Sequence, residues 1–265
     1  MLLRMESVAR ALLPGVLGCI LCTTSFAQSG VLFAIPTESQ SNQPLTPNAP
    51  WRIALEARDP AALARVLNVA APAANAKALS YTLDSYPQIS GNPARTWLES
   101  SFVIDYQEPD VAKLYKAFLQ VARHEWARQQ LLDFISGRMT ASPGHAFEVA
   151  SQVARSLTGD CKEYAVLTAA LARSAGVPAR VALGLVLLEY DGRYAAFGHA
   201  WAEIREDNKW VVADATAQKF AGAARYLPFG ILEDEGPGFE MAVTRLTPVW
   251  IQRVVVLGAA TTDVR

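Results

Sequence analysis

Cysteine is scarce in this 265-residue chain, which has only Cys19, Cys22 and Cys161. The first two lie in an N-terminal segment that we expect to be removed, so the mature chain keeps one thiol without a partner. Paired cysteines usually become structural disulfides in exported proteins, and this chain offers no such pair. The rest of the chain is long enough to bury a hydrophobic core and to be stable without disulfides.

An excess of charge is also lacking, because 24 Lys and Arg residues stand against 25 Asp and Glu residues. Nucleic-acid binding needs clustered cations, so this balance argues against a nucleic-acid partner. The three histidines, His124, His145 and His199, do not have the spacing of metal ligands. HExxH does not occur, and CxxC occurs only at Cys19–Cys22, within the segment that we expect to be removed. We therefore predict a protein that needs no metal and no cofactor.

Long apolar runs are absent beyond the N-terminus. Residues 1–27 have the pattern of a secretory signal peptide, with two arginines, an apolar stretch and small residues before a cleavage point after Ala27. The apolar stretch falls short of the roughly 20 residues that span a bilayer. We predict a periplasmic or extracellular protein with no membrane span after cleavage. Lipid attachment at Cys19, in a loosely lipobox-like sequence, is the minor alternative.

Composition divides the chain beyond residue 27 into three parts. Residues 28–95 are predicted to form a flexible leader, rich in Ser, Gln, Asn and Pro, and an N-terminal extension. Residues 96–220 are predicted to form the core, and residues 221–265 to add strands that pack on it. Within the core the pattern predicts a strand over 96–106, a long amphipathic helical region over 110–136 and a second helix over 146–156.

The most informative pattern begins at Cys161. Residues 161–175 are predicted to form a helix that is apolar nearly all round after its first turn, which is typical of a helix buried on every side. Gly176 and Pro178 follow it as stop signals. Predicted strands over 180–190, 194–205 and 209–215 come next, and Asp191-Gly192 is a strong hairpin signal between the first two. A buried helix packed on an antiparallel meander predicts an α+β fold.

Cys161 is placed in the first turn of this helix, where unpaired N–H groups carry partial positive charge. Such a position favours the thiolate, which is the nucleophilic form of cysteine. Asp160 and Glu163 oppose this effect with their negative charge, although Glu163 is interpreted first as a helix cap. Stabilisation of the thiolate is therefore expected to fall mainly to a nearby histidine.

Strand register brings His199 and Asp214 together. If the turn between the last two strands is centred between Asp207 and Asn208, Trp201 faces Asp214 and His199 lies diagonal to Asp214 on the same sheet face. Diagonal Cα atoms are about 7–8 Å apart, which a His–carboxylate hydrogen bond can bridge.

Each candidate residue taken singly has a structural explanation: a buried thiol, a hydrogen-bonded histidine in a strand, and an aspartate at a strand end. Taken together they favour covalent catalysis. Cys161 would be the nucleophile, His199 the general base and acid, and Asp214 the residue that orients the imidazole.

These residues resemble the transglutaminase-like superfamily, a branch of the papain-like fold. The resemblance runs from Ala150 to Thr216. It rests on four blocks: Gly159-Asp160-Cys161 with its helix, Ala175-Gly176-Val177-Pro178-Ala179-Arg180-Val181, Gly198-His199-Ala200-Trp201-Ala202-Glu203 and Trp210-Val211-Val212-Ala213-Asp214-Ala215-Thr216. It implies a papain-like core with N-terminal helices, and a Cys161–His199–Asp214 triad that works through a thioester. An upstream aromatic residue often completes the oxyanion hole of this family, and the sequence does not identify it here.

The sequence thus predicts an exported cysteine-dependent acyltransferase or hydrolase acting on amide bonds of peptides or proteins. One alternative is a non-catalytic transglutaminase-like binding module that keeps the groove. Another is a structural thiol that forms an intermolecular disulfide. The sequence does not show whether water or an amine accepts the acyl group. It does not show the oligomeric state either.

Overall fold

The computed structural model describes residues 33–41, 49–89, 91, 94–123, 126–142, 144, 146–220, 223–241 and 251–260. The predicted signal peptide with Cys19 and Cys22 lies outside these residues, as do His124 and His145. The helices are α2 (Pro60–Val66), η1 (Ala94–Leu98), α3 (Pro109–Val121), α4 (Arg128–Arg138), α5 (Ala150–Ser156), α6 (Cys161–Ser174) and η2 (Ala217–Lys219). The strands are β1 (Phe33–Ile35), β2 (Thr37–Ser39), β3 (Trp51–Ala57), β4 (Ala78–Leu83), β5 (Thr140–Ala141), β6 (Thr158–Gly159), β7 (Ala179–Tyr190), β8 (Arg193–Glu206), β9 (Lys209–Ala213), β10 (Ala223–Ile231) and β11 (Ile251–Ala259).

The central sheet is built on the β7–β8 hairpin. Its strand order is β1-β8-β7-β10, and β9 also pairs with β8. Asp191 and Gly192 close the hairpin with φ of 52° and 72°, the positive values that a type I′ turn requires and that Asp-Gly readily adopts. The β8–β9 turn is centred between Asp207 and Asn208, and the pairing of Ala202 with Ala213 confirms the predicted register.

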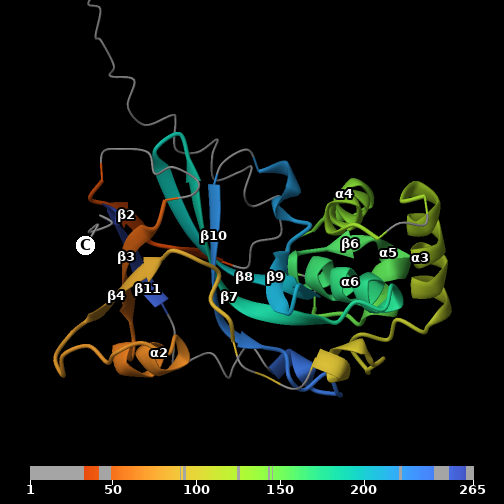
Figure 1. The fold of residues 1–265 in the computed structure, drawn as a ribbon, viewed down its shortest axis with the longest axis horizontal. Coiled ribbons are helices and arrows are strands. Elements are labelled where there is room, and N and C mark those ends of the chain that lie inside the picture. The colour runs from red at the N-terminus through yellow and green to blue at the C-terminus, as the bar shows by residue number, and fades with distance from the viewer. Residues whose placement is uncertain are drawn as a thin grey trace, which may run out of the picture.

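Helix α6 is the centre of the helical layer. Every residue from Cys161 to Arg173 is buried, as the apolar pattern predicted. The helix lies against β7 and β8, while α3, α4 and α5 surround its remaining sides (Figure 1). The predicted α+β arrangement, a buried helix that begins at the cysteine and packs on an antiparallel sheet, is therefore confirmed.

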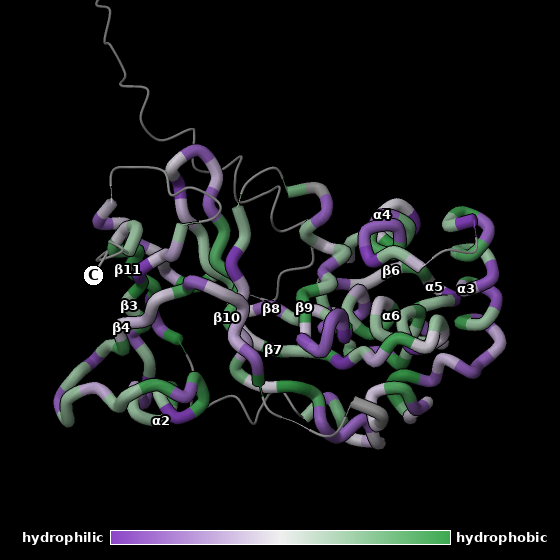
Figure 2. The backbone as a smooth tube through the Cα atoms, in the orientation of Figure 1, coloured by the Kyte–Doolittle hydropathy of each residue, from purple (hydrophilic) through white to green (hydrophobic). Residues whose placement is uncertain are grey.

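A second sheet lies at the opposite end of the molecule (Figure 1). Its order is β2-β11-β3-β4, with β11 parallel to β2 and antiparallel to β3. Helix α2 covers it through three consecutive buried residues, Ala62, Leu63 and Ala64. Figure 2 shows apolar stretches, in green, along α2 and the strands of this sheet.

The strands β7 and β8 serve two hydrophobic cores. Leu183 and Ala200 belong to the core around α6, whereas Leu185 and Ala196 belong to the core of the second sheet. The division falls at the paired positions of Gly184 and His199. His199 therefore lies where the two cores meet.

Several predicted elements differ from the structure. The segment predicted as a flexible leader contains β1, which pairs with β8, and β2, which pairs with β11. The strand predicted over 96–106 is wrong: η1 is followed by irregular backbone, in which Val103 donates to Glu235 and accepts from Ala150 without forming a ladder.

The long helical region predicted over 110–136 is two helices. Arg123 has φ of 51°, a left-handed conformation that ends a helix, and α4 begins anew at Arg128. The following helix, predicted from residue 146, begins at Ala150.

Gly184 is required by a close approach of strands. A Cβ atom there would lie 2.2 Å from the Leu227 carbonyl oxygen and 3.0 Å from the Trp201 ring. Gly184→Ala is expected to lower the free energy of unfolding by about 1–3 kcal/mol, the usual cost of overpacking. Urea unfolding measures this. Gly137→Ala is the control, because nothing lies within 4 Å of that Cβ, and an equal midpoint for both variants would contradict the prediction.

Candidate active site

Cys161 is the first residue of α6 and is 0% exposed. A capping box holds this helix start: the Asp160 side chain accepts from the Lys162 N–H at 3.1 Å, and the Glu163 side chain accepts from the Asp160 N–H at 2.9 Å. The interpretation of Glu163 as a cap is confirmed. The sulfur is therefore carried by a rigid, buried turn with the partial positive charge of a helix N-terminus.

The two acids beside the thiol are compensated. Both carboxylate oxygens of Asp160 lie 2.5 Å from Lys162 Nζ. Burial raises the pKa of Glu163 to about 7, against the opposing effects of its hydrogen bond from the Asp160 backbone and of Lys162. Near neutral pH a large fraction of Glu163 is protonated. Little uncompensated negative charge remains to oppose a thiolate at Cys161.

Asp214 is surrounded by hydrogen-bond donors. Its Oδ2 lies 2.7 Å from His199 Nε2 and accepts from the Tyr226 hydroxyl at 2.9 Å. Its Oδ1 accepts from Thr216 twice, from the backbone N–H at 2.9 Å and from the hydroxyl at 2.6 Å. Burial favours the neutral acid, but these donors, His199 above all, outweigh it and lower the Asp214 pKa.

The pKa of His199 is raised above the ordinary histidine value. Burial lowers its pKa, but attraction to Asp214 and the hydrogen bond between them, with a contribution from Cys161, raise it to about 10. Nδ1 has no hydrogen-bond partner among the described residues. Since Nε2 is held by Asp214, Nδ1 is the nitrogen available to the thiol. The structure thus brings the three predicted residues together, from the start of α6, the middle of β8 and the residue after β9.

The edge of β8 is interrupted at His199. β7 occupies one edge of β8 along its length. On the other edge β1 pairs with residues 196–198 and β9 with residues 202–206. Between them, residues 199–201 have no neighbouring strand among the described residues. The imidazole lies at this interruption of the sheet.

Trp201 does more than fill space. Its indole ring stacks on the His199 imidazole, with centroids 5.9 Å apart and planes 25° apart. Tyr226 packs against the same two rings, 5.2 Å from Trp201 and 6.2 Å from His199. Tyr226 belongs to none of the sequence motifs; it lies on β10 and contacts Asp214 from 12 residues away. Thr216 had a signal, since Asp-x-Thr is a common side-chain turn.

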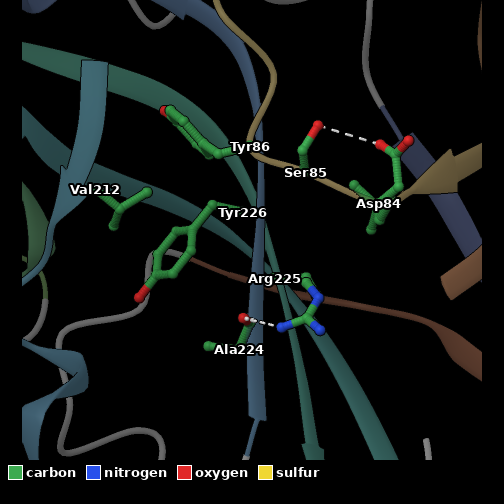
Figure 3. Close-up of a pocket in the computed structure, with 8 residues that line it drawn as sticks. Asp84, Ser85, Tyr86, Val212, Ala224, Arg225 and Tyr226 are labelled. Atoms are coloured by element: carbon green, nitrogen blue, oxygen red, sulfur yellow. Dashed lines mark hydrogen bonds between the residues drawn. The ribbon is translucent and has the colours of Figure 1, made fainter. Parts of the chain in front are cut away.

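A cavity of about 320 Å³ is lined in part by Tyr226. Tyr86 and Tyr226 form one side of it, and Asp84 and Arg225 lie across from them (Figure 3). Cys161 and His199 do not line it. Cys161, His199 and Asp214 are all nearly inaccessible, at 0%, 3% and 4% exposure.

Within the described ranges, His, Cys, Asp and Glu side chains form no cluster of three or more that suits a metal ion. In the same part of the chain no helix has the length and apolar character needed to cross a membrane.

Comparison with known families places this region. Residues 110–215 match the model of the transglutaminase-like superfamily. The matched residues are thus similar to this superfamily. This span holds α3 to β9 with Cys161, His199 and Asp214, so the predicted resemblance is confirmed. A comparison with curated proteins gives no match.

A comparison with solved structures gives partial matches. A Cytophaga hutchinsonii protein proposed to be a cysteine protease is 21% identical, with a TM-score of 0.38, over 48% of this chain and 43% of its own. The periplasmic domain of TgpA from Pseudomonas aeruginosa is 22% identical, with a TM-score of 0.36, over 54% of this chain and 55% of its own. This chain therefore spans about half the length of these structures.

The His199 pKa leads to a direct prediction. Nitrogen NMR should find the imidazole protonated through neutral pH and titrating near pH 10. The pairing should stabilise the fold fully below pH 6.5, the ordinary histidine pKa, and this stabilisation should be lost as the pH rises through about 10. Cys161→Ala should lower the His199 pKa, because the thiol contributes to it. Titration of wild-type His199 at or below 6.5 would contradict this arrangement.

Proposed function

We propose that the protein is an exported cysteine-dependent enzyme that acts on amide bonds of peptides or proteins through a thioester, with Cys161, His199 and Asp214 as its triad. The observation that carries the proposal is the imidazole of His199, hydrogen-bonded to Asp214 through Nε2, with Nδ1 unpartnered among the described residues and the Cys161 thiol close enough to raise its pKa. The match of residues 110–215 to the transglutaminase-like superfamily supports cysteine chemistry in general.

The first half of the reaction would form the acyl-enzyme. The Cys161 thiolate attacks the amide carbon, and a C–S bond forms as the carbonyl oxygen takes up the electron pair. Backbone N–H groups at the start of α6 are suited to stabilise this oxyanion. The imidazolium of His199 gives its proton to the amide nitrogen, and the C–N bond breaks. An amine or ammonia departs, and a thioester remains on Cys161.

The second half would return the enzyme to its starting state. His199, now neutral, takes a proton from water or from a primary amine as it attacks the thioester carbon. The C–S bond breaks and the thiolate is released beside an imidazolium. Throughout both steps Asp214 keeps the ring oriented and stabilises its charged form.

A mass measurement identifies the reaction. The protein is incubated with a glutamine-containing peptide and a primary amine, with Cys161→Ala as the control. Incorporation of the amine with loss of ammonia indicates acyl transfer, the mass change of deamidation indicates hydrolysis at the side chain, and peptide fragments indicate cleavage of the backbone. Each product should be absent with Cys161→Ala.

A non-catalytic binding module is the rival function, and the complete burial of Cys161 is what favours it. Iodoacetamide labelling between about pH 5 and pH 8 separates the two, because a catalytic thiolate reacts well below the ordinary thiol range. A thiol that stays unlabelled up to pH 8 would support the binding module. A non-reducing gel tests the intermolecular disulfide.

A further inference from the structure

A segment before the transglutaminase-like region lies across the central sheet. We call residues 84–89 the strap; they follow β4 and precede the family-matching residues 110–215. The Gln88 side chain holds the strap to β9, donating to the Trp210 carbonyl at 2.9 Å and accepting from the Trp210 N–H at 2.9 Å. The Ile89 carbonyl accepts from Arg180 Nη2 at 3.0 Å. The strap is thus fastened to both β9 and β7.

Tyr86 is the strap residue that contacts Trp201. Its hydroxyl accepts from the Trp201 indole N–H at 2.9 Å and donates to the Glu203 carboxylate. The direction is fixed, because an indole N–H only donates and an ionised carboxylate only accepts. Glu203 is in turn fixed by the buried Arg180, whose Nε lies 2.5 Å from it. Burial and the neighbouring Glu203 raise the Tyr86 pKa, so the hydroxyl keeps its proton.

The indole held by Tyr86 is the one that stacks on His199. Trp201 and His199 lie on the same face of β8, two residues apart, with planes 25° apart. Rotation of the indole would displace the imidazole plane, and with it the direction of Nδ1. A hydrogen bond at the indole N–H opposes this rotation, and Tyr86 supplies it.

We propose that Tyr86 is a positioning residue for His199, supplied by the N-terminal extension and acting through Trp201. It does not touch the triad. It fixes the orientation of the Trp201 indole, and the indole fixes the orientation of the His199 imidazole that pairs with the thiol. The inference rests on the proposed function for its kinetic readout. It adds a requirement that the transglutaminase-like residues 110–215 do not meet alone: the strap must be docked for the triad to be aligned.

Tyr86→Phe in the full chain tests this role, because it removes only the hydroxyl. A misalignment transmitted from outside the reacting groups typically costs up to about 100-fold in rate. We expect kcat to fall about 10- to 100-fold with KM little changed, the His199 nitrogen resonances to shift, and the pH profile of iodoacetamide labelling at Cys161 to move. Tyr81→Phe, the same deletion on β4 away from Trp201, is the matched control and should leave all three unchanged.

The two proposals fail in different ways. If wild-type Cys161 shows neither turnover nor labelling at neutral pH, the enzyme proposal fails. If wild type reacts and Tyr86→Phe matches it in kcat, labelling profile and His199 resonances, the positioning role is overturned. Should Tyr86→Phe not fold, Gln88→Ala loosens the strap and leaves Tyr86 intact. It must then produce the same His199 shift in weaker form, and an unchanged spectrum would overturn the proposal.

Discussion

Asp214→Asn is expected to reduce turnover about 10⁴-fold, the loss seen when a Ser–His–Asp triad undergoes the same change. The carboxylate of Asp214 receives only donors: His199 and Tyr226 at one oxygen and Thr216 twice at the other. An asparagine must turn its NH₂ toward one of these pairs, so donors face donors. The imidazolium also loses its counter-charge. Steady-state kinetics and iodoacetamide labelling of Cys161 measure the effect.

Asp191→Asn is the control for that substitution. Asp191 is exposed in the β7–β8 turn with φ of 52°, a conformation that asparagine adopts well, so the variant should behave as wild type. The His199 pKa provides a second measurement, since loss of Asp214 removes the main influence that raises it. An Asp214→Asn protein with wild-type turnover and an unshifted His199 would exclude the aspartate from the proposed role.

Glu203→Gln is expected to lower the free energy of unfolding by about 3–5 kcal/mol, the usual cost of breaking a buried ion pair. Arg180 and Glu203 are both 0% exposed, and their pairing distance is 2.5 Å. Without the carboxylate, the guanidinium keeps the Ile89 carbonyl and the face of Trp210, 4.1 Å away, but no counter-charge. Urea unfolding followed by tryptophan fluorescence provides the measurement.

A neighbouring glutamate on the same strand provides the control. Glu206 pairs with Arg128 at 3.5 Å, and both side chains are more than a third exposed, so Glu206→Gln should cost only about 0–1 kcal/mol. Replacing Arg180 and Glu203 together with methionine should recover much of the lost stability, because no unpaired charge then remains buried. Equal unfolding midpoints for Glu203→Gln and Glu206→Gln would contradict the role given to the buried pair.

Local signals predicted the region from α6 to β9 well. The all-round apolar pattern after Cys161, the Asp-Gly turn and the even-length turn at Asp207 each depend on residues near in sequence, and the structure agrees with all three. The contact of His199 with Asp214 follows from that register. Their chemical roles stay predictions, which the substitutions above test.

The features that the sequence did not predict depend on contacts between residues distant in sequence or on unusual backbone conformations. Strand β1 forms from a leader-like sequence because it pairs with β8, more than 160 residues later. Tyr86 reaches Trp201 across 115 residues, and nothing around it in the sequence distinguishes it from another loop tyrosine. The break between α3 and α4 depends on a left-handed arginine, which is an uncommon residue in that conformation.

The hydrogen bonds of the Gln88 side chain to the Trp210 backbone affect how β9 can pair with other polypeptide chains. The outward N–H and C=O of Trp210 are both taken by this amide, and the Val212 carbonyl accepts from Arg128 at 2.9 Å. An uncovered outer strand offers a template on which extended polypeptides aggregate. With these groups occupied, β9 offers an unfolded neighbour fewer free backbone groups to pair with.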